Sequence, residues 1–201
     1  MYEVEKKAYL REDILEKVKK IAIFKYCTEK KDIYFTNVKG RKVNIYTDRV
    51  FRIREENGEK ILSYKDKSFN NKTEINKEHE IDISNVDLLK LKEFFNYMEI
   101  YPFIEKTKKT SLYNMDYEGF KLNIECNEIE NLGRFIEVEI ITEDKNIENA
   151  VKAIDNFFEE IGIKEEEIEK RYYIDLLMER NDEAFNCRWW PFYSKNAWDN
   201  S

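Results

Sequence analysis

The first strand-like stretch of the chain reads Glu3-Val4-Glu5-Lys6-Lys7-Ala8, and its pattern of charged and apolar side chains decides how the remaining sequence is interpreted. Successive residues of a β-strand face opposite sides of a sheet. Glu3, Glu5 and Lys7 therefore share one face, opposite the apolar Val4. The stretch predicts a strand with one charged face and one largely apolar face.

Further stretches separate polar from apolar side chains in the same way. Their polar faces carry Arg52 and Arg54; Asn76, Glu78, Glu80 and Asp82; Lys121, Asn123, Glu125 and Asn127; and Glu137 and Glu139. An antiparallel sheet with one solvated face is the simpler interpretation of such stripes. It does not explain why like charges are grouped, since neighbouring like charges repel. In a closed barrel, groups of opposite sign face one another across a lumen, and the apolar faces turn outward under helices.

Apolar periodicity divides the chain into strand-like and helix-like segments. Stretches rich in Ile, Val, Tyr and Phe predict strands at residues 2–9, 31–38, 42–54, 59–67, 75–83, 103–113, 117–126 and 134–142. Helical spacing predicts helices at residues 11–24, 85–97, 146–161 and 165–179, with Ser84 and Asn85 as N-cap candidates for the second. The expected fold class is α+β, with about eight antiparallel strands and a few helices packed outside.

Composition limits the classes of protein that the chain can belong to. Its 201 residues are 42% hydrophobic and 38% charged, which is typical of a globular protein with a high charge density. We expect one domain over residues 1–180, followed at residues 181–201 by an aromatic tail. The net charge of -7 argues against a nucleic-acid partner, because phosphate backbones favour clustered Lys and Arg.

The cysteines and the first residues of the chain indicate the cellular compartment in which we expect the protein. Cys27, Cys126 and Cys187 are an odd number without a close pair, which favours reduced thiols over a disulfide framework. The first residues form no apolar segment of signal or membrane-spanning length. We therefore expect a cytoplasmic protein that has no membrane partner.

A charged lumen restricts the ligand. Charges are costly in a dry interior, so the lumen should hold water and a ligand of complementary charge pattern. Guanidinium and ammonium groups bind phosphate oxygens, whereas carboxylates bind hard divalent cations such as Mg²⁺. A triphosphate with bound metal ions fits both requirements.

The ordered motifs of the chain resemble those of the CYTH superfamily of triphosphate tunnel metalloenzymes. Glu3-Val4-Glu5-Lys6-Lys7 resembles the ExExK signature that opens the family. The companion motifs follow in the family's order: Asp32-Ile33-Tyr34-Phe35, Phe51-Arg52-Ile53-Arg54, Leu62-Ser63-Tyr64-Lys65, Asn76-Lys77-Glu78-His79-Glu80, the basic run from Lys106 to Lys109, and Leu132-Gly133-Arg134-Phe135-Ile136-Glu137-Val138-Glu139. The resemblance covers residues 1 to about 180.

The resemblance implies a fold and a set of site residues. The fold is an eight-stranded antiparallel closed β-barrel, a tunnel with a charged lumen and about four helices outside. The implied cofactor is Mg²⁺ or Mn²⁺, with the metal ligands Glu3, Glu5, Glu137 and Glu139 and a further acid, Glu125. The implied triphosphate-binding residues are Lys7, Arg52, Arg54, Lys65, Lys106 and Lys108, with Glu78 and Glu80 as supporting acids. Of all these, Glu5, Lys7 and Arg54 are the implied catalytic residues.

The chain departs from the family pattern at three places. Family members often carry an Asp shortly before the Leu-Gly turn, where the candidates on the same strand face are Glu125 and Asn127, and only Glu125 supplies charge. The basic run from Lys106 to Lys109 contains no Arg, and the sequence does not show which of its lysines face the lumen. Asn76 stands where some members have Arg.

The implied partner is a small-molecule triphosphate, and the family contains two kinds of reaction on it. Water attacking the terminal phosphorus hydrolyses inorganic tripolyphosphate, thiamine triphosphate or a nucleoside triphosphate, and we expect this reaction. A ribose 3′-hydroxyl attacking the α-phosphorus of ATP gives cyclic AMP and pyrophosphate, as in a class IV adenylate cyclase, and is the alternative. A further alternative is a non-catalytic triphosphate receptor whose tail engages a partner through Trp189, Trp190 and Trp198. Whether the chain forms a homodimer is left open.

Overall fold

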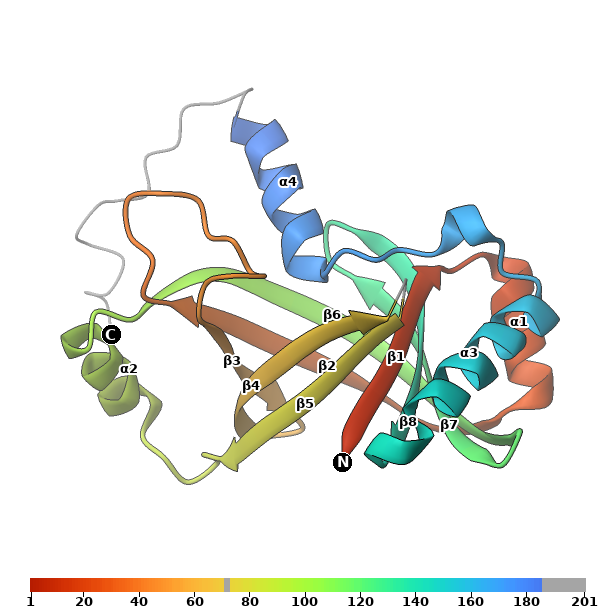
Figure 1. Ribbon diagram of the computed structural model, residues 1–201. Helices are drawn as coiled ribbons and strands as arrows, with labels where there is room; N and C mark the ends of the chain where they lie inside the picture. The colour runs from red at the N-terminus through yellow and green to blue at the C-terminus, as the bar shows by residue number, and fades with distance from the viewer. Residues whose placement is uncertain (71–72, 186–201) are drawn as a thin grey trace. The chain divides into compact units, whose positions relative to one another are not determined.

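The strands close into an antiparallel barrel in the order β1-β5-β4-β3-β2-β6-β7-β8 (Figure 1). The computed structural model describes residues 1–70 and 73–185. The strands are β1 (Tyr2–Tyr9), β2 (Ile23–Thr36), β3 (Val50–Glu56), β4 (Glu59–Asn70), β5 (Thr73–Asp82), β6 (Tyr101–Tyr117), β7 (Phe120–Ile129) and β8 (Gly133–Thr142). Closure pairs β1 with both β5 and β8. The prediction of a closed eight-stranded antiparallel barrel is confirmed.

A two-residue turn fixes the register of the β3–β4 hairpin. Asn57 and Gly58 join β3 to β4, and both have positive φ, at 51° and 85°. Two positive φ angles in succession match the right-handed twist of a hairpin, and Asn-Gly adopts them at low cost. The turn sets Arg52 opposite Ser63 and Arg54 opposite Ile61.

Three α-helices belong to the same compact unit as the barrel, Met1–Lys170. They are α1 (Glu12–Ile21), α2 (Leu88–Tyr97) and α3 (Ile147–Ile161), with short 3-10 helices η1 (Asp144–Asn146) and η2 (Glu165–Glu167). Helix α4 (Tyr173–Phe185) lies in a second unit, which begins at Arg171. Within this unit, Arg171 forms an ion pair with Glu179. Among the helices of the described ranges, none has the length and apolarity needed to cross a membrane.

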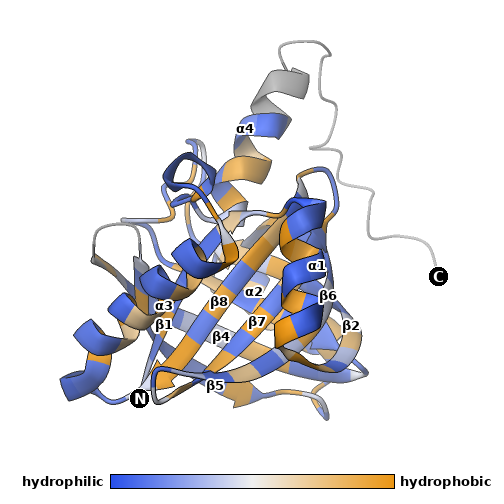
Figure 2. Ribbon diagram, turned by 90° about the vertical axis from the view of Figure 1, so that its right-hand side faces the viewer, coloured by the Kyte–Doolittle hydropathy of each residue, from blue (hydrophilic) through white to orange (hydrophobic). Residues whose placement is uncertain are grey.

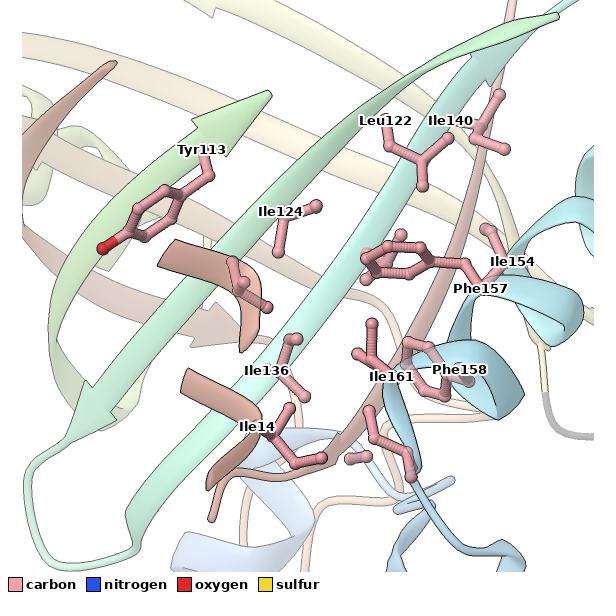
Figure 3. Close-up of a cluster of buried hydrophobic side chains, with 14 of the residues drawn as sticks. Ile14, Tyr113, Leu122, Ile124, Ile136, Ile140, Ile154, Phe157, Phe158 and Ile161 are labelled. Carbon is pink, nitrogen blue, oxygen red and sulfur yellow. The ribbon is translucent and has the colours of Figure 1, made fainter. Parts of the chain in front are cut away.

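The main hydrophobic core lies outside the barrel, between the strands and the helices α1 and α3. Figure 2 shows apolar and polar residues alternating along β7 and β8, beside α1 and α3. Ile124 and Ile136 of the strands pack with Ile14 of α1 and Phe157 of α3, and each of these side chains is fully buried (Figure 3). Burying such a side chain contributes about 1.5–3 kcal/mol. Since the apolar faces of these strands pack against the helices outside the barrel, the opposite faces of the strands turn toward the lumen.

A smaller core lies under α2. Phe35 of β2 and Ile53 of β3 pack with Phe95 of α2 and with Ile83. Asp87 caps this helix by accepting hydrogen bonds from the backbone N–H groups of Leu89 and Lys90. The predicted N-caps, Ser84 and Asn85, are therefore wrong, because the helix begins later than its apolar pattern suggested.

Two predicted elements differ from the structure. Strand β2 begins at Ile23, inside the predicted helix 11–24, because the backbone is already extended at the C-cap Ala22. Residues 42–49 form a loop with a turn at residues 45–47 instead of the predicted strand, and Asp48 there accepts hydrogen bonds from Arg41 and from the backbone of Asn44. Local hydrogen bonding by short polar side chains favours turns over strands.

The fourth predicted helix, 165–179, begins as the 3-10 turn η2, and its α-helical part starts only at Tyr173. Trp189, Trp190 and Trp198 of the predicted aromatic tail, and Cys187, lie outside the described residues.

Candidate functional site

An acidic cluster lies on two neighbouring strands of the lumen. Glu3 and Glu5 of β1 and Glu139 of β8 each place a carboxylate oxygen within 4.8 Å of the others. Strand pairing explains the cluster, because Glu5 is directly opposite Glu139 in the β1–β8 ladder. All three residues are half-buried.

The cluster carries more negative charge than its surroundings offset. Burial raises the pKa of Glu3 to about 7, against the opposing effect of Lys65, and Glu78 and Glu139 raise it further. Burial and the charge of Glu5 also raise the pKa of Glu139. The cluster is therefore suited to an added cation.

Lys65 of β4 connects this cluster to the basic residues. Its Nζ lies 2.8 Å from Glu3, 3.8 Å from Glu5 and 3.3 Å from Glu78. Arg52 donates to Glu78 at 2.9 Å. Burial opposes ionisation of Glu78, but Lys65 and Arg52 outweigh it and lower its pKa.

Asp32 of β2 organises a second group. Arg54 donates to its two carboxylate oxygens, at 2.7 and 2.9 Å, and Lys106 of β6 lies 2.9 Å away. The Tyr34 hydroxyl donates to the same carboxylate at 3.3 Å. Burial opposes ionisation of Asp32, which is 1% exposed, yet Lys106 and Arg54 hold its pKa well below the usual range.

A third group joins β2, β6, β7 and β8. Lys108 lies 2.6 Å from Glu125 and 2.9 Å from Glu137, and Lys30 lies 2.6 Å from Glu125. Asn127 donates to Glu137 at 2.7 Å. Burial raises the pKa of both acids, but Lys108 outweighs it, and the pKa of Glu125 is well below its ordinary value.

Lys7 and Glu74 form a fourth group between β1 and β5. Lys7 Nζ lies 3.5 Å from Glu74, and both side chains are buried. Burial and the charge of Glu5 raise the pKa of Glu74 to about 7. Asn76 donates to Glu74 at 3.4 Å, while its own side-chain oxygen is buried and has no hydrogen-bond partner. Asn76 is opposite Glu3 in the β1–β5 ladder, so it offers an oxygen ligand on the strand next to the acidic cluster.

The structure shows which of the residues expected from the sequence lie in the lumen and which groups they contact. Lys106 and Lys108 are the buried members of the basic run, and Lys109 is exposed. Glu125 and Glu137, expected as metal ligands, have their carboxylates on Lys108 instead of in the cluster of Glu3. Glu80 is exposed, and its carboxylate makes no ion pair within the described ranges.

Sequence reasoning missed three lumen residues. Asp32 was visible in its motif, but its partner Arg54 is adjacent only through the β2–β3 pairing. Glu74 and Lys30 each lie one residue before a predicted strand, at 75–83 and 31–38, so neither was assigned a face. Extending both alternations by one residue would have found them.

These groups define a class of protein, an antiparallel tunnel whose interior holds an acidic cluster beside buried cations. The family model for the CYTH domain matches residues 1–173, and the chain belongs to the CYTH domain family. The resemblance drawn from the motifs is thereby confirmed. Among curated proteins, no sequence matched the chain.

Solved structures share this fold. The PH1819 protein from Pyrococcus horikoshii OT3 is 30% identical with a TM-score of 0.74, over 89% of this chain and 99% of that chain. A putative adenylate cyclase from Vibrio parahaemolyticus is 17% identical with a TM-score of 0.68, over 89% and 98%. HpAC1 from Hippeastrum, a putative adenylyl cyclase described with a dominant triphosphatase activity, is 14% identical with a TM-score of 0.60, over 90% and 96%. The last two likenesses show the fold alone.

Proposed function

We propose that the chain is a divalent-metal-dependent enzyme that hydrolyses a triphosphate in the lumen of its barrel. The observation that carries the proposal is the position of the carboxylates of Glu3, Glu5 and Glu139, which lie within 4.8 Å of one another beside Lys65. Opposite charges separated within one lumen match a ligand that combines metal ions with phosphates.

The residues present fit a Mg²⁺ or Mn²⁺ ion. Both ions prefer oxygen ligands, and the cluster supplies three carboxylates whose mutual repulsion a cation would relieve. The unpartnered side-chain oxygen of Asn76, across from Glu3, is a neutral ligand of the same kind. In this proposal Glu3, Glu5 and Glu139 hold the metal, whereas Glu125 and Glu137 position Lys108. When bound, the metal neutralises charge on phosphoryl oxygens.

The cations of the lumen would hold the phosphate oxygens. Arg52, Arg54, Lys65, Lys106, Lys108 and Lys7 are each within 3.5 Å of a lumen carboxylate. A phosphate entering the lumen would share these cations, and charge-assisted hydrogen bonds of this kind are short and strong. Because their carboxylate partners fix them beforehand, little reorganisation is needed as charge develops in the transition state.

We favour hydrolysis over cyclisation because hydrolysis requires fewer side chains in fixed positions. Water attacking the terminal phosphorus needs no base or ribose pocket built from particular side chains. Glu5, Lys7 and Arg54 are the residues that we assign to catalysis, through charge and positioning. Cyclisation of ATP remains the second candidate, since the Vibrio parahaemolyticus structure of the same fold carries the description of a putative adenylate cyclase.

Product analysis separates these reactions. Pure protein is incubated with tripolyphosphate, thiamine triphosphate or ATP in Mg²⁺ or Mn²⁺, and products are followed by ³¹P NMR. The proposal predicts release of inorganic phosphate from at least one substrate, and none after chelation of the metal. Formation of cyclic AMP and pyrophosphate without free phosphate would establish the cyclase instead. Ligand-dependent thermal stabilisation with no turnover would establish the non-catalytic receptor.

A further inference from the structure

Lys30 of β2 is a cation of the lumen to which the proposed function gives no role. It is buried, at 8% exposed. It lies directly opposite Lys108 in the β2–β6 ladder and opposite Glu56 in the β2–β3 ladder. Like charges directly opposite one another on neighbouring strands repel. The pairing of Lys30 with Lys108 therefore needs an acid close to both lysines.

Glu125 of β7 is that acid. Lys30 donates to its Oε1 and Lys108 donates to its Oε2, each at 2.6 Å. Asn127 also donates to Oε2, at 3.3 Å. Burial raises the pKa of Glu125, but Lys108 and then Lys30 outweigh burial and hold this pKa well below its ordinary value. The carboxylate of Glu125 therefore lies between two lysines, with one on each oxygen.

Lys108 also contacts a second acid, because it donates to Glu137 at 2.9 Å. An ammonium group has three donors, so Lys108 can contact both acids and still donate to a phosphate oxygen. Lys30 and Lys108 together balance the charges of Glu125 and Glu137. Without Lys30, the two acids would share one ammonium group, and their excess negative charge would repel an incoming phosphate.

We propose that Lys30 is a positioning residue for the triphosphate, because it neutralises Glu125 and so leaves Lys108 able to donate to a phosphate oxygen. A buried carboxylate that loses its counter-charge is costly, and Lys30 removes this cost when a phosphate draws Lys108 away. Lys30 acts through Glu125 and Lys108 and does not itself contact the phosphates. The inference rests on the proposed function of the lumen.

Calorimetric titration of the full chain with imidotriphosphate in Mg²⁺ tests this role. In this analogue of tripolyphosphate, NH groups replace the bridging oxygens, so that affinity is measured without turnover. Lys30→Met should weaken binding at least about tenfold, because Glu125 then competes with the phosphate for Lys108. Lys30→Gln keeps a hydrogen-bond donor near Glu125 but removes the charge, and it should weaken binding to a similar extent. Cooperative unfolding in urea checks that each variant is folded.

A double variant separates positioning from direct contact. Lys30→Met combined with Glu125→Gln removes both charges of the pair and leaves Lys108 with Glu137. Its affinity should return to within about threefold of wild type, since the remaining charges are balanced again. The matched control is Lys31→Met, which alters the next residue of β2, whose side chain is exposed and lies 3.5 Å from Glu29. This variant should keep the wild-type affinity.

Three results would overturn the role of Lys30. They are wild-type affinity in both Lys30→Met and Lys30→Gln, a loss in Lys31→Met equal to that in Lys30→Met, and a double variant as weak as Lys30→Met. The last result would show that Lys30 contacts the phosphates directly. If the wild-type chain did not bind imidotriphosphate at all, the proposed function of the lumen would fail, and the role of Lys30 with it.

Discussion

Arg54 donates two hydrogen bonds to Asp32, at 2.7 and 2.9 Å, from directly opposite it in the β2–β3 ladder. The fork-shaped guanidinium group matches the two carboxylate oxygens. Lys106 reaches the same carboxylate from β6, at 2.9 Å. One buried acid therefore holds two of the cations that we assign to phosphate binding.

Replacing Asp32 by Asn should destabilise the protein by about 3 kcal/mol or more, because it removes the carboxylate that pairs with the buried Lys106 and the partly buried Arg54. Urea unfolding at pH 7 measures the loss. Asp66→Asn, on the exposed face of β4, is the matched control and should change stability by less than about 0.5 kcal/mol. Added tripolyphosphate should recover part of the stability of Asp32→Asn, since phosphate oxygens replace the carboxylate. Equal stability of the two variants would contradict the role of Asp32.

Glu74 should give the protein a pH-dependent loss of stability. Its folded-state pKa of about 7 is raised above the unfolded value near 4.3, so ionisation favours the unfolded chain. The loss is absent below about pH 4 and grows as pH rises toward 7. Relative to wild type, Glu74→Gln should therefore gain roughly 3 kcal/mol between pH 4.5 and pH 7, by denaturant titration at several pH values. A difference in stability between Glu74→Gln and wild type that does not change with pH would contradict the raised pKa of Glu74.

Glu5→Gln should raise the metal concentration needed for half-maximal turnover by at least about tenfold, because a carboxylate of the acidic cluster is lost. Titration with Mn²⁺, followed by electron paramagnetic resonance, measures the metal affinity without turnover. Glu128→Gln removes an exposed carboxylate on β7 and should leave both quantities unchanged. Similar metal affinities for the two variants would remove Glu5 from the metal site.

Lys108→Met should raise the KM for the triphosphate roughly tenfold or more, since it removes a cation held between Glu125 and Glu137. The matched control, Lys109→Met, alters the neighbouring exposed side chain and should keep the wild-type KM. Steady-state kinetics at saturating Mg²⁺ compares the two. If Lys109→Met raised KM as much as Lys108→Met, nonspecific surface charge would explain the effect.

The strand faces could be predicted because side-chain direction in a strand has period two, so Glu3, Glu5 and Glu139 were assigned to the lumen from local sequence. The family resemblance implied that these acids form one cluster, and the structure shows that the pairing of Glu5 with Glu139 brings them together. The partners of Glu125 and Glu137 were not predictable in this way. Glu137 and Glu139 share a stripe, yet only the arrangement of the closed barrel decides that Glu137 meets Lys108.

The start of β2 and the loop before β3 show where local patterns fail. Apolar residues near Ile23 fit a helix as well as a strand, and pairing with β6 decides for the strand. The turn at Asp48 depends on side-chain hydrogen bonds that periodicity does not register.

The most direct measurement is a crystal structure of the protein soaked with tripolyphosphate and Mn²⁺, recorded with anomalous scattering at the manganese edge. We predict an anomalous peak bound by Glu3, Glu5 and Glu139, with phosphate density against Arg54, Lys106 and Lys108. Manganese and phosphate bound only on the outer surface, with the lumen ion pairs unchanged, would contradict the account.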